Sequence, residues 1–364
     1  MEDTRTYVPF QRWNEPSKQI EYTCPTPLLA PDGRLQAKGW ARRNLFEYDR
    51  SKVKSRFISR KEWDFYQISD GKCMLQLNYV NLKLAGYVSA KFVDLRTGEV
   101  IADTMQLYFG GEKKHIPPAR GDVPNRILDR IGKAEVDFDT RENDRTLYLK
   151  TLLKKKTLEC KIRMDILPDL ENMTTVLPFD EDPTRFFMTT KQTCMPAEGT
   201  FSFGDFTYRF SKEDSFAVLD WGRVNTVHKM VWYWGSGATY VTDARGEKHL
   251  FGFEITWAIG NESHATETCL FYDGKVHKFG AVDVETFPKP DKYMEPWKFV
   301  SEDGRFRMTM VPTFDHHTDL NLGIGRMHTH QVHGLWSGEA VLDDGTKLEI
   351  KDMYAFCEYV ENRW

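Results

Sequence analysis

The side chains best suited to chemistry gather between residues 216 and 235, in the stretch FAVLDWGRVNTVHKMVWYWG. Asp220, Arg223 and His228 supply an acid, a fixed cation and a titratable imidazole. Three of the ten tryptophans of the chain stand beside them: Trp221, Trp232 and Trp234. Because ionisable groups set among indole rings are typical of a ligand pocket, we predict the functional site here.

The spacing in this stretch predicts the two faces of a β-strand. Asp220 and Gly222 share one face, whereas Trp221 points to the other. Trp232 and Trp234 likewise share a face. If these faces line a barrel, the indoles form an apolar wall beside the carboxyl group. Loss of water raises the pKa of such a carboxyl group until it can protonate an olefin or a carbonyl.

An architectural role for the same residues stays open. In that alternative, Asp220 and Arg223 form a structural ion pair at a domain junction, and the tryptophans belong to the core.

A second carboxylate candidate follows shortly after this stretch. An antiparallel return of the chain brings Glu267, and with it Asn261, towards Trp234 and Asp220. Two carboxyl groups in different environments can divide acid and base roles between them. The alternative for Glu267 is a solvent-facing position on a strand.

Histidines form a second constellation: His316, His317, His328, His330 and His333. In the HxH pattern, His328 and His330 lie on one face of a strand, roughly 6–7 Å apart along the chain. This spacing suits zinc or iron if a neighbouring strand supplies a third ligand, for which Asp315, Asp319 and Glu339 are candidates. His333 points to the other face. We expect no resident metal and keep His330 and His333 as ligand-binding candidates.

The elements that must position these residues are short strands. Asp-Gly pairs at Asp273-Gly274 and Asp344-Gly345 interrupt alternating apolar segments, which is a strong hairpin signal. Such hairpins predict antiparallel meanders closed into barrels. A short helix is expected over 123–138 alone. The predicted fold class is therefore all-β with little helix.

Segments rich in proline and acidic residues suggest how the chain divides into an arm and two domains. Residues 1–60 read as an irregular arm packed on the body, 61–225 as a first barrel and 226–364 as a second. The proline- and acid-rich start of 167–200 predicts a surface connection. Trp63 is expected to close the opening of the first barrel as a structural residue.

Composition excludes several classes of function. The net charge of -4 and pI near 6.2 give no electrostatic case for nucleic acid. Six cysteines lie without a CxxC pair, and the N-terminus lacks signal-peptide features, so we expect a cytoplasmic protein. No apolar run approaches 18 residues, which excludes a transmembrane helix. No glycine-rich phosphate loop, GxSxG elbow or HExxH motif occurs.

An ordered series of motifs resembles the bacterial family known as domain of unknown function 2804. The series runs EYTCPTPLLAPDGRLQAKGWARR, RKEWDFYQI, LDWGR, WYWG, PWKF, QVHGLWSGEAVLDDG and ENRW, over roughly residues 20–364. The resemblance carries over no activity.

A more distant resemblance links GTFSFGDFTYRFSKEDSFAVLDWGR and WYWG to the carotenoid hydratase (hydroxyneurosporene synthase) family and the related decalin-forming cyclases. It implies two lipocalin-like, calycin-type β-barrels packed together. Asp220 and Gly222 match that family's acid and final glycine. Trp221 stands where the family has histidine or arginine, a role that Arg223 or His228 would have to take.

These observations lead to one main hypothesis and two alternatives. The main one is a cofactor-independent hydratase, isomerase or cyclase for an apolar, unsaturated small molecule near the domain junction. The alternatives are a non-catalytic carrier of a lipid or polyketide and a metal-dependent enzyme using His328 and His330. The candidate catalytic residues are Asp220, Glu267, His228 and Arg223. The candidate ligand-binding residues are Trp221, Trp232, Trp234, Asn261, His330 and His333.

Overall fold

The computed structural model describes residues 16–363 apart from 57, 168, 244, 287–291 and 322–324. Within these residues the chain is all-β, and the one helical element is a single 3-10 turn, η1 (Arg50–Lys52). In the same part of the chain, no helix has the length and apolar character needed to cross a membrane.

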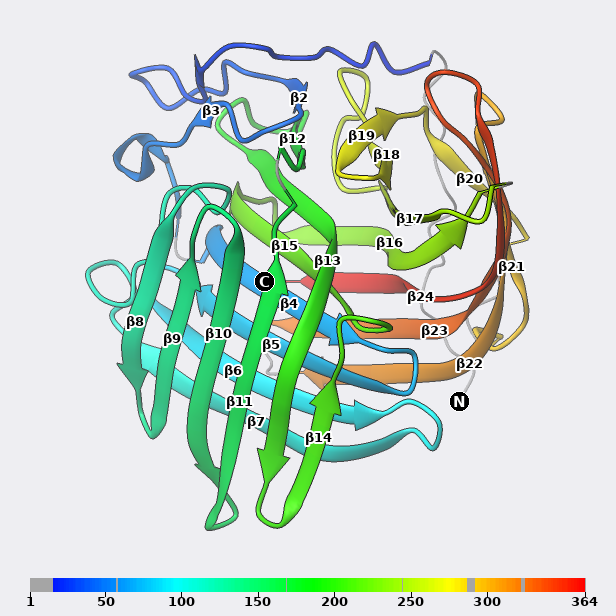
Figure 1. The fold of residues 1–364 in the computed structure, drawn as a ribbon. Coiled ribbons are helices and arrows are strands. Elements are labelled where there is room, and N and C mark those ends of the chain that lie inside the picture. Colours follow the sequence, from blue (N-terminus) through cyan, green and yellow to red (C-terminus); the bar gives the residue numbers. More distant parts are fainter. Residues whose placement is uncertain are drawn as a thin grey trace.

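Thirteen strands of the described chain form the first sheet. Its main path runs through β7 (Glu99–Phe109), β6 (Ala85–Asp94), β5 (Cys73–Asn81), β4 (Arg60–Ser69), β15 (Phe216–Asn225), β13 (Phe186–Phe203), β11 (Lys156–Asp165), β10 (Asp144–Leu153), β9 (Ala134–Thr140) and β8 (Asn125–Ile131). The strands β12 (Met173–Pro178) and β14 (Phe206–Phe210) pair with β13, and β2 (Gly39–Ala41) pairs with β12. The sheet bends so that β4–β7 lie behind β8–β11 in Figure 1, with a buried apolar core between them.

Nine strands of the described residues form the second sheet. Their order is β19 (Lys275–Lys278), β18 (Glu267–Tyr272), β17 (Lys248–Trp257), β16 (Lys229–Thr242), β24 (Lys347–Arg363), β23 (Arg326–Val341), β22 (Phe306–Asn321), β21 (Trp297–Ser301) and β20 (Val282–Thr286). Neighbouring strands are antiparallel, and the sheet curves around its own core of aromatic and aliphatic side chains. The structure therefore contains two lipocalin-like barrels packed together.

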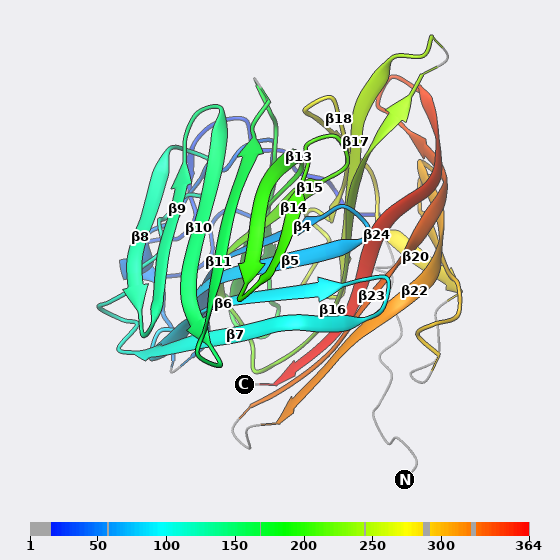
Figure 2. The same cartoon turned by 60° about the horizontal axis from the view of Figure 1, so that its bottom comes forward.

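The barrels meet through their walls. Figures 1 and 2 show the second sheet beside the first, with β8–β11 on the far side. In β15, Leu219 and Trp221 enter the first core, whereas Val218 packs with Trp234 of the second sheet. Both faces of β15 are thus covered, which explains why Ala217–Asn225 are buried without alternation. The last strand of the first sheet ends at Asn225 and the next begins at Lys229. The proposed domain boundaries themselves stay a prediction.

The described part of the N-terminal arm packs across both barrels. Figure 1 shows it in dark blue over the top of the sheets. It contains the parallel pair β1 (Thr26–Pro27) and β3 (Phe46–Glu47). Trp40 packs in one apolar cluster with Met173 of the first sheet and Phe271 of the second. Residues 1–15 of the predicted arm lie outside the described residues.

Two expectations about local structure are wrong. Residues 123–138 form no helix; they form the hairpin of β8 and β9, which turns at Gly132 with φ of 58°. Residues 167–200 are no simple surface connection, because they contain β12 and most of β13. All six residues of the short run MTTVLP are buried: β13 pairs along its whole length, and β2 pairs with Thr174–Val176 on the other side.

Candidate functional site

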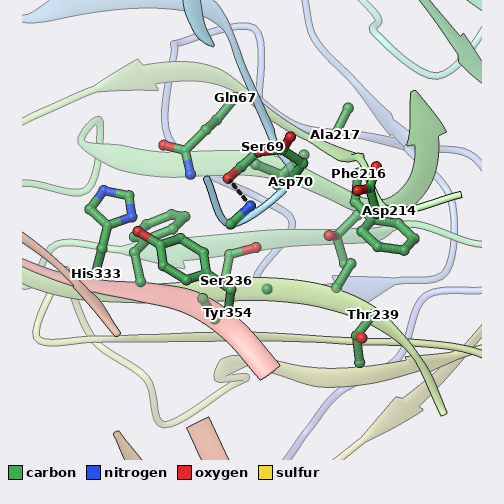
Figure 3. A pocket seen from close by; sticks show the side chains of 17 residues that line it. Gln67, Ser69, Asp70, Asp214, Phe216, Ala217, Ser236, Thr239, His333 and Tyr354 are labelled. Carbon is green, nitrogen blue, oxygen red and sulfur yellow. Dashed lines mark hydrogen bonds between the residues drawn. The ribbon is translucent and has the colours of Figure 1, made fainter. Parts of the chain in front are cut away.

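Two cavities lie between the barrels rather than inside either one. The larger, of about 340 Å³, is lined by β4, β5, β6, β13 and β15 from one side and β16, β17, β22, β23 and β24 from the other. Much of its wall is aromatic: Trp63, Phe65, Tyr87, Phe187, Trp232 and Trp234. The smaller, of about 150 Å³, lies further along the same interface. In Figure 3, Gln67 and Ser69 of the first sheet face His333 and Tyr354 of the second across it.

An ion pair stands in the wall of the larger cavity. The ammonium of Lys191 on β13 lies 3.0 Å from Oδ1 of Asp220 on β15, and Trp63 Nε1 donates to Oδ2 at 3.1 Å. Lys191 is 3% exposed and lies over the ring of Trp234, 4.0 Å from its centroid. Asp220 therefore has its two oxygens held by a cation and an indole N–H, at a position that is largely buried.

The positive charge of Lys191 also acts on the other carboxylates around it. Its Nζ lies 3.9 Å from Glu267 Oε2. Burial by itself would lower the pKa of Lys191, but Asp220, Glu267 and Glu254 raise it above its ordinary value. The lysine therefore stays charged and neutralises part of a cluster that would otherwise repel itself.

Two indoles in this region each donate to a buried glutamate. Trp234 Nε1 donates to Glu254 at 2.7 Å, and Ser236 donates to the other oxygen of Glu254 at 2.7 Å. Trp232 Nε1 donates to Glu358 at 3.0 Å. Burial raises the pKa of Glu254 to about 8 and that of Glu358 to about 7. Both glutamates therefore carry a proton for part of the time near neutral pH.

Glu358 differs from Glu254 in lining the cavity. Gln331 Nε2 donates to its second oxygen at 3.1 Å, and the charges of Lys191 and Asp220 both act on its pKa. Asp220 and Glu358 thus face one cavity from opposite barrels. Asp220 is paired with a cation, whereas the two oxygens of Glu358 accept from the neutral N–H groups of Trp232 and Gln331.

The family model described as domain of unknown function (DUF2804) matches residues 19–364, which takes in both walls of this cavity. The chain belongs to the DUF2804 family. Among solved structures, an AttH-like protein of Nitrosomonas europaea is 10% identical, with a TM-score of 0.45 over 83% of this chain and 92% of its own. Kievitone hydratase of Nectria haematococca is 12% identical, with a TM-score of 0.42 over 87% and 92%. None of the curated proteins matches the sequence.

Part of the predicted site comes together in this DUF2804 protein. Asp220 and the indoles of Trp232 and Trp234 meet at the cavity, as the strand spacing indicates. Glu267 is fully buried beside Lys191 and accepts from Thr189, so the solvent-facing alternative is wrong. Burial raises its pKa above the ordinary value.

Other predicted residues lie elsewhere. Trp221 and Arg223 stack in the first barrel, on the opposite face of β15, with the guanidinium 4.2 Å from the ring centroid. Arg223 pairs with Asp64 at 2.8 Å. The alternative of an ion pair between Asp220 and Arg223 is therefore wrong, because a spacing of three residues puts them on opposite faces. His228 is exposed and lies 3.4 Å from Arg363.

The remaining candidates also lie away from the larger cavity. Asn261 donates to Asp180 and accepts from the amide of Ser263 in a surface turn. His333 lines the smaller cavity, where burial lowers its pKa to about 3 and keeps the ring neutral. His330 is on the opposite face of β23 from the cavity-lining Gln331.

Four members of the site were missed or given another role from the sequence: Lys191, Glu254, Glu358 and Trp63. A usable signal exists for the first three. Each is the only charge within an apolar, threonine-rich or aromatic stretch of its strand, as in FFMTTKQTCM, FGFEITW and MYAFCEYV. A buried charge in such a strand needs a partner, so these lone charges predict one another.

Gly222 leaves the space that the Trp63 indole occupies in the wall of the larger cavity. A Cβ at this position would meet the indole at 2.1 Å, so the ring can lie here only against glycine. We expect Gly222→Ala to displace the indole from Asp220 and to lower the free energy of unfolding by about 1–3 kcal/mol. Tryptophan fluorescence and urea unfolding measure the two effects. Trp63→Phe, which removes the N–H but keeps a ring, should cost less; equal costs would contradict the steric explanation.

The raised pKa of Glu254 predicts a pH dependence of stability. Between about pH 4.5 and pH 8 the folded chain holds a proton on Glu254 that the unfolded chain releases, so stability is full below this range and declines through it. Each pKa unit corresponds to about 1.4 kcal/mol, so the decline amounts to a few kcal/mol. Glu254→Gln should flatten the curve of unfolding free energy against pH, measured with urea. The exposed Glu349→Gln serves as control, and parallel curves for wild type and Glu254→Gln would refute the assignment.

Proposed function

We propose that this protein is a cofactor-independent acid–base enzyme that hydrates, isomerises or cyclises an apolar, unsaturated small molecule between its two barrels. The observation that carries the proposal is Glu358, a buried carboxyl group with a pKa of about 7 that faces the Asp220–Lys191 pair across an aromatic cavity. Carboxyl groups whose environments differ in this way divide acid and base roles in enzymes.

Glu358 supplies the proton in this scheme. Its carboxylic acid transfers the proton to one carbon of a double bond, and the resulting carboxylate is stabilised by the N–H groups of Trp232 and Gln331. Positive charge develops on the neighbouring carbon. The Asp220 carboxylate lies in the opposite wall and provides the compensating negative charge.

Asp220 then completes the reaction as the base. In hydration it takes a proton from the water whose oxygen bonds to the cationic carbon; in isomerisation it takes the proton from the adjacent carbon. Solvent exchange afterwards returns Asp220 and Glu358 to their starting protonation states. Lys191 already lies over one face of the Trp234 ring, and its positive charge disfavours a second cation there. The shielding role therefore belongs to Trp63 and Trp232.

The ionisable side chains in the cavity wall favour an enzyme over a carrier. A carrier of apolar molecules gains nothing from a buried ion pair and a protonatable glutamate in its cavity, since desolvating these groups costs free energy. A catalyst requires them.

The test starts with the molecule that the protein retains. Native mass spectrometry of purified protein identifies an apolar ligand, which is then incubated with the enzyme in D₂O. We expect carbon-bound deuterium in the ligand, at a rate above that in protein-free buffer. Retention of an apolar ligand without deuterium incorporation, water addition or rearrangement would support the carrier and overturn the enzyme.

A further inference from the structure

We propose that the second barrel holds a divalent transition-metal ion of the zinc class between His317 of β22 and His328 and His330 of β23. This site is separate from the proposed chemistry. On β23, Thr329 and Gln331 line the larger cavity, whereas His328 and His330 alternate with them and occupy the other face of the strand.

The strand register supplies a third ligand that the HxH pattern lacks. His317 lies directly opposite His330 in the antiparallel pairing of β22 and β23. One ligand atom from each of the three imidazoles lies within 4.8 Å of the others. His317 Nε2 and His328 Nδ1 are 3.4 Å apart. Two nitrogens bound to one tetrahedral zinc at about 2.0–2.1 Å lie about 3.3 Å apart, so this pair already has the required separation.

The ring of His330 is held in place from two sides. Its Nδ1 lies 2.7 Å from Asp315 Oδ2, which leaves Nε2 for a metal. Tyr293 stacks on the ring at a centroid distance of 3.8 Å. A carboxylate behind a ligating histidine is a common feature of zinc sites, where it fixes the tautomer and strengthens the ligand. Asp315, which the sequence suggested as a third ligand, lies in this supporting position.

The surroundings suit a cation with an accessible coordination position. Asp319 Oδ2 lies 3.7 Å from His328 Nδ1 and brings negative charge to the cluster, partly offset by Arg326 at 3.4 Å. His328 and His330 are buried, whereas His317 is exposed. Three protein ligands and one position open to water are the usual set for zinc with imidazole ligands.

The first experiment measures zinc binding to protein prepared without a histidine tag and stripped with a chelator. Calorimetric titration with ZnCl₂ should give one site per chain, and Co²⁺ should give the visible absorption of a tetrahedral complex. His317→Ala should weaken binding at least about 100-fold. His316→Ala is the matched control, because the adjacent residue lines the cavity on the other face of β22 and should leave zinc affinity unchanged.

Two further variants keep the test decisive. Asp315→Asn should weaken binding by about 10–100-fold without removing a ligand. His328→Ala should also weaken zinc binding. If this variant fails to fold, the zinc affinity of His317→Ala still tests the proposal, because His317 is exposed. Absence of stoichiometric binding, or unchanged affinity in His317→Ala, overturns the proposal. So does binding that disappears in His249→Ala, since Asp243, Glu247 and His249 form a second group of possible ligands at the surface.

Discussion

Replacing Lys191 with methionine is expected to lower the free energy of unfolding by about 3–5 kcal/mol, because it leaves buried carboxylates without their cation. Lys191 lies 3.0 Å from Asp220 and 3.9 Å from Glu267, and it is 3% exposed. Removing the ammonium leaves the negative charge of these carboxylates buried without a compensating cation. Urea unfolding at neutral pH measures the effect.

The matched control is Lys161→Met, which removes a lysine that is 58% exposed and lies 2.8 Å from Glu159. Solvent screens exposed pairs, which contribute little to stability, so this variant should remain close to wild type. The double variant Lys191→Met/Asp220→Asn should recover part of the loss, since it removes the stranded charge as well. A loss below about 1 kcal/mol in Lys191→Met would show that the ion pair does not organise the site.

Glu358→Gln is expected to reduce turnover by about 10²–10⁴-fold while ligand binding persists, since the amide keeps the shape of the side chain but has no acidic proton. The readout is deuterium incorporation into the retained ligand in D₂O, together with its affinity by native mass spectrometry. Glu349→Gln, an exposed change on the same strand, is the control. Full activity in Glu358→Gln would remove this residue from the mechanism.

The pH profile provides an independent check on the same residue. A general acid must be protonated, and the pKa of Glu358 is about 7 because of burial, with Lys191 lowering it and Asp220 raising it. Turnover should therefore be highest below about pH 7 and decline about tenfold per unit above it. A rate that rises with pH across this range would indicate a base at this position instead.

The fold was largely predictable from the sequence, because the alternation of apolar and polar residues and the Asp-Gly turns are local signals. Asp273-Gly274 and Asp344-Gly345 both lie at turns between strands. The segment 123–138 misled because Ile127 and Ile131 are four residues apart, a spacing that suits a helix as well as a strand. The structure has a turn at Gly132, which joins β8 and β9 into a hairpin.

The site was predictable only where it depends on which side chains of a single strand share a face. The shared face of Trp232 and Trp234 follows from a spacing of two, as does the separation of Asp220 from Trp221. Which walls face each other is a property of the packing between sheets. Lys191 lies directly opposite Asp220 on the neighbouring strand β13. Glu358 comes from the other sheet: a lone charge in its stretch of strand signals that a partner is needed, whereas its position across the cavity from Asp220 requires the complete fold.

The placement of the cavity between barrels also bears on how this protein can change over time. Asp220 and Lys191 belong to one sheet and Glu358 to the other, while the linker between the sheets is short. In the proposed mechanism neither half carries all the reacting groups, so we expect that separating the halves abolishes the proposed activity even if each half folds. Under the proposed mechanism, a substitution that changes the charge or shape of one wall therefore has to be matched by the wall that the other barrel contributes.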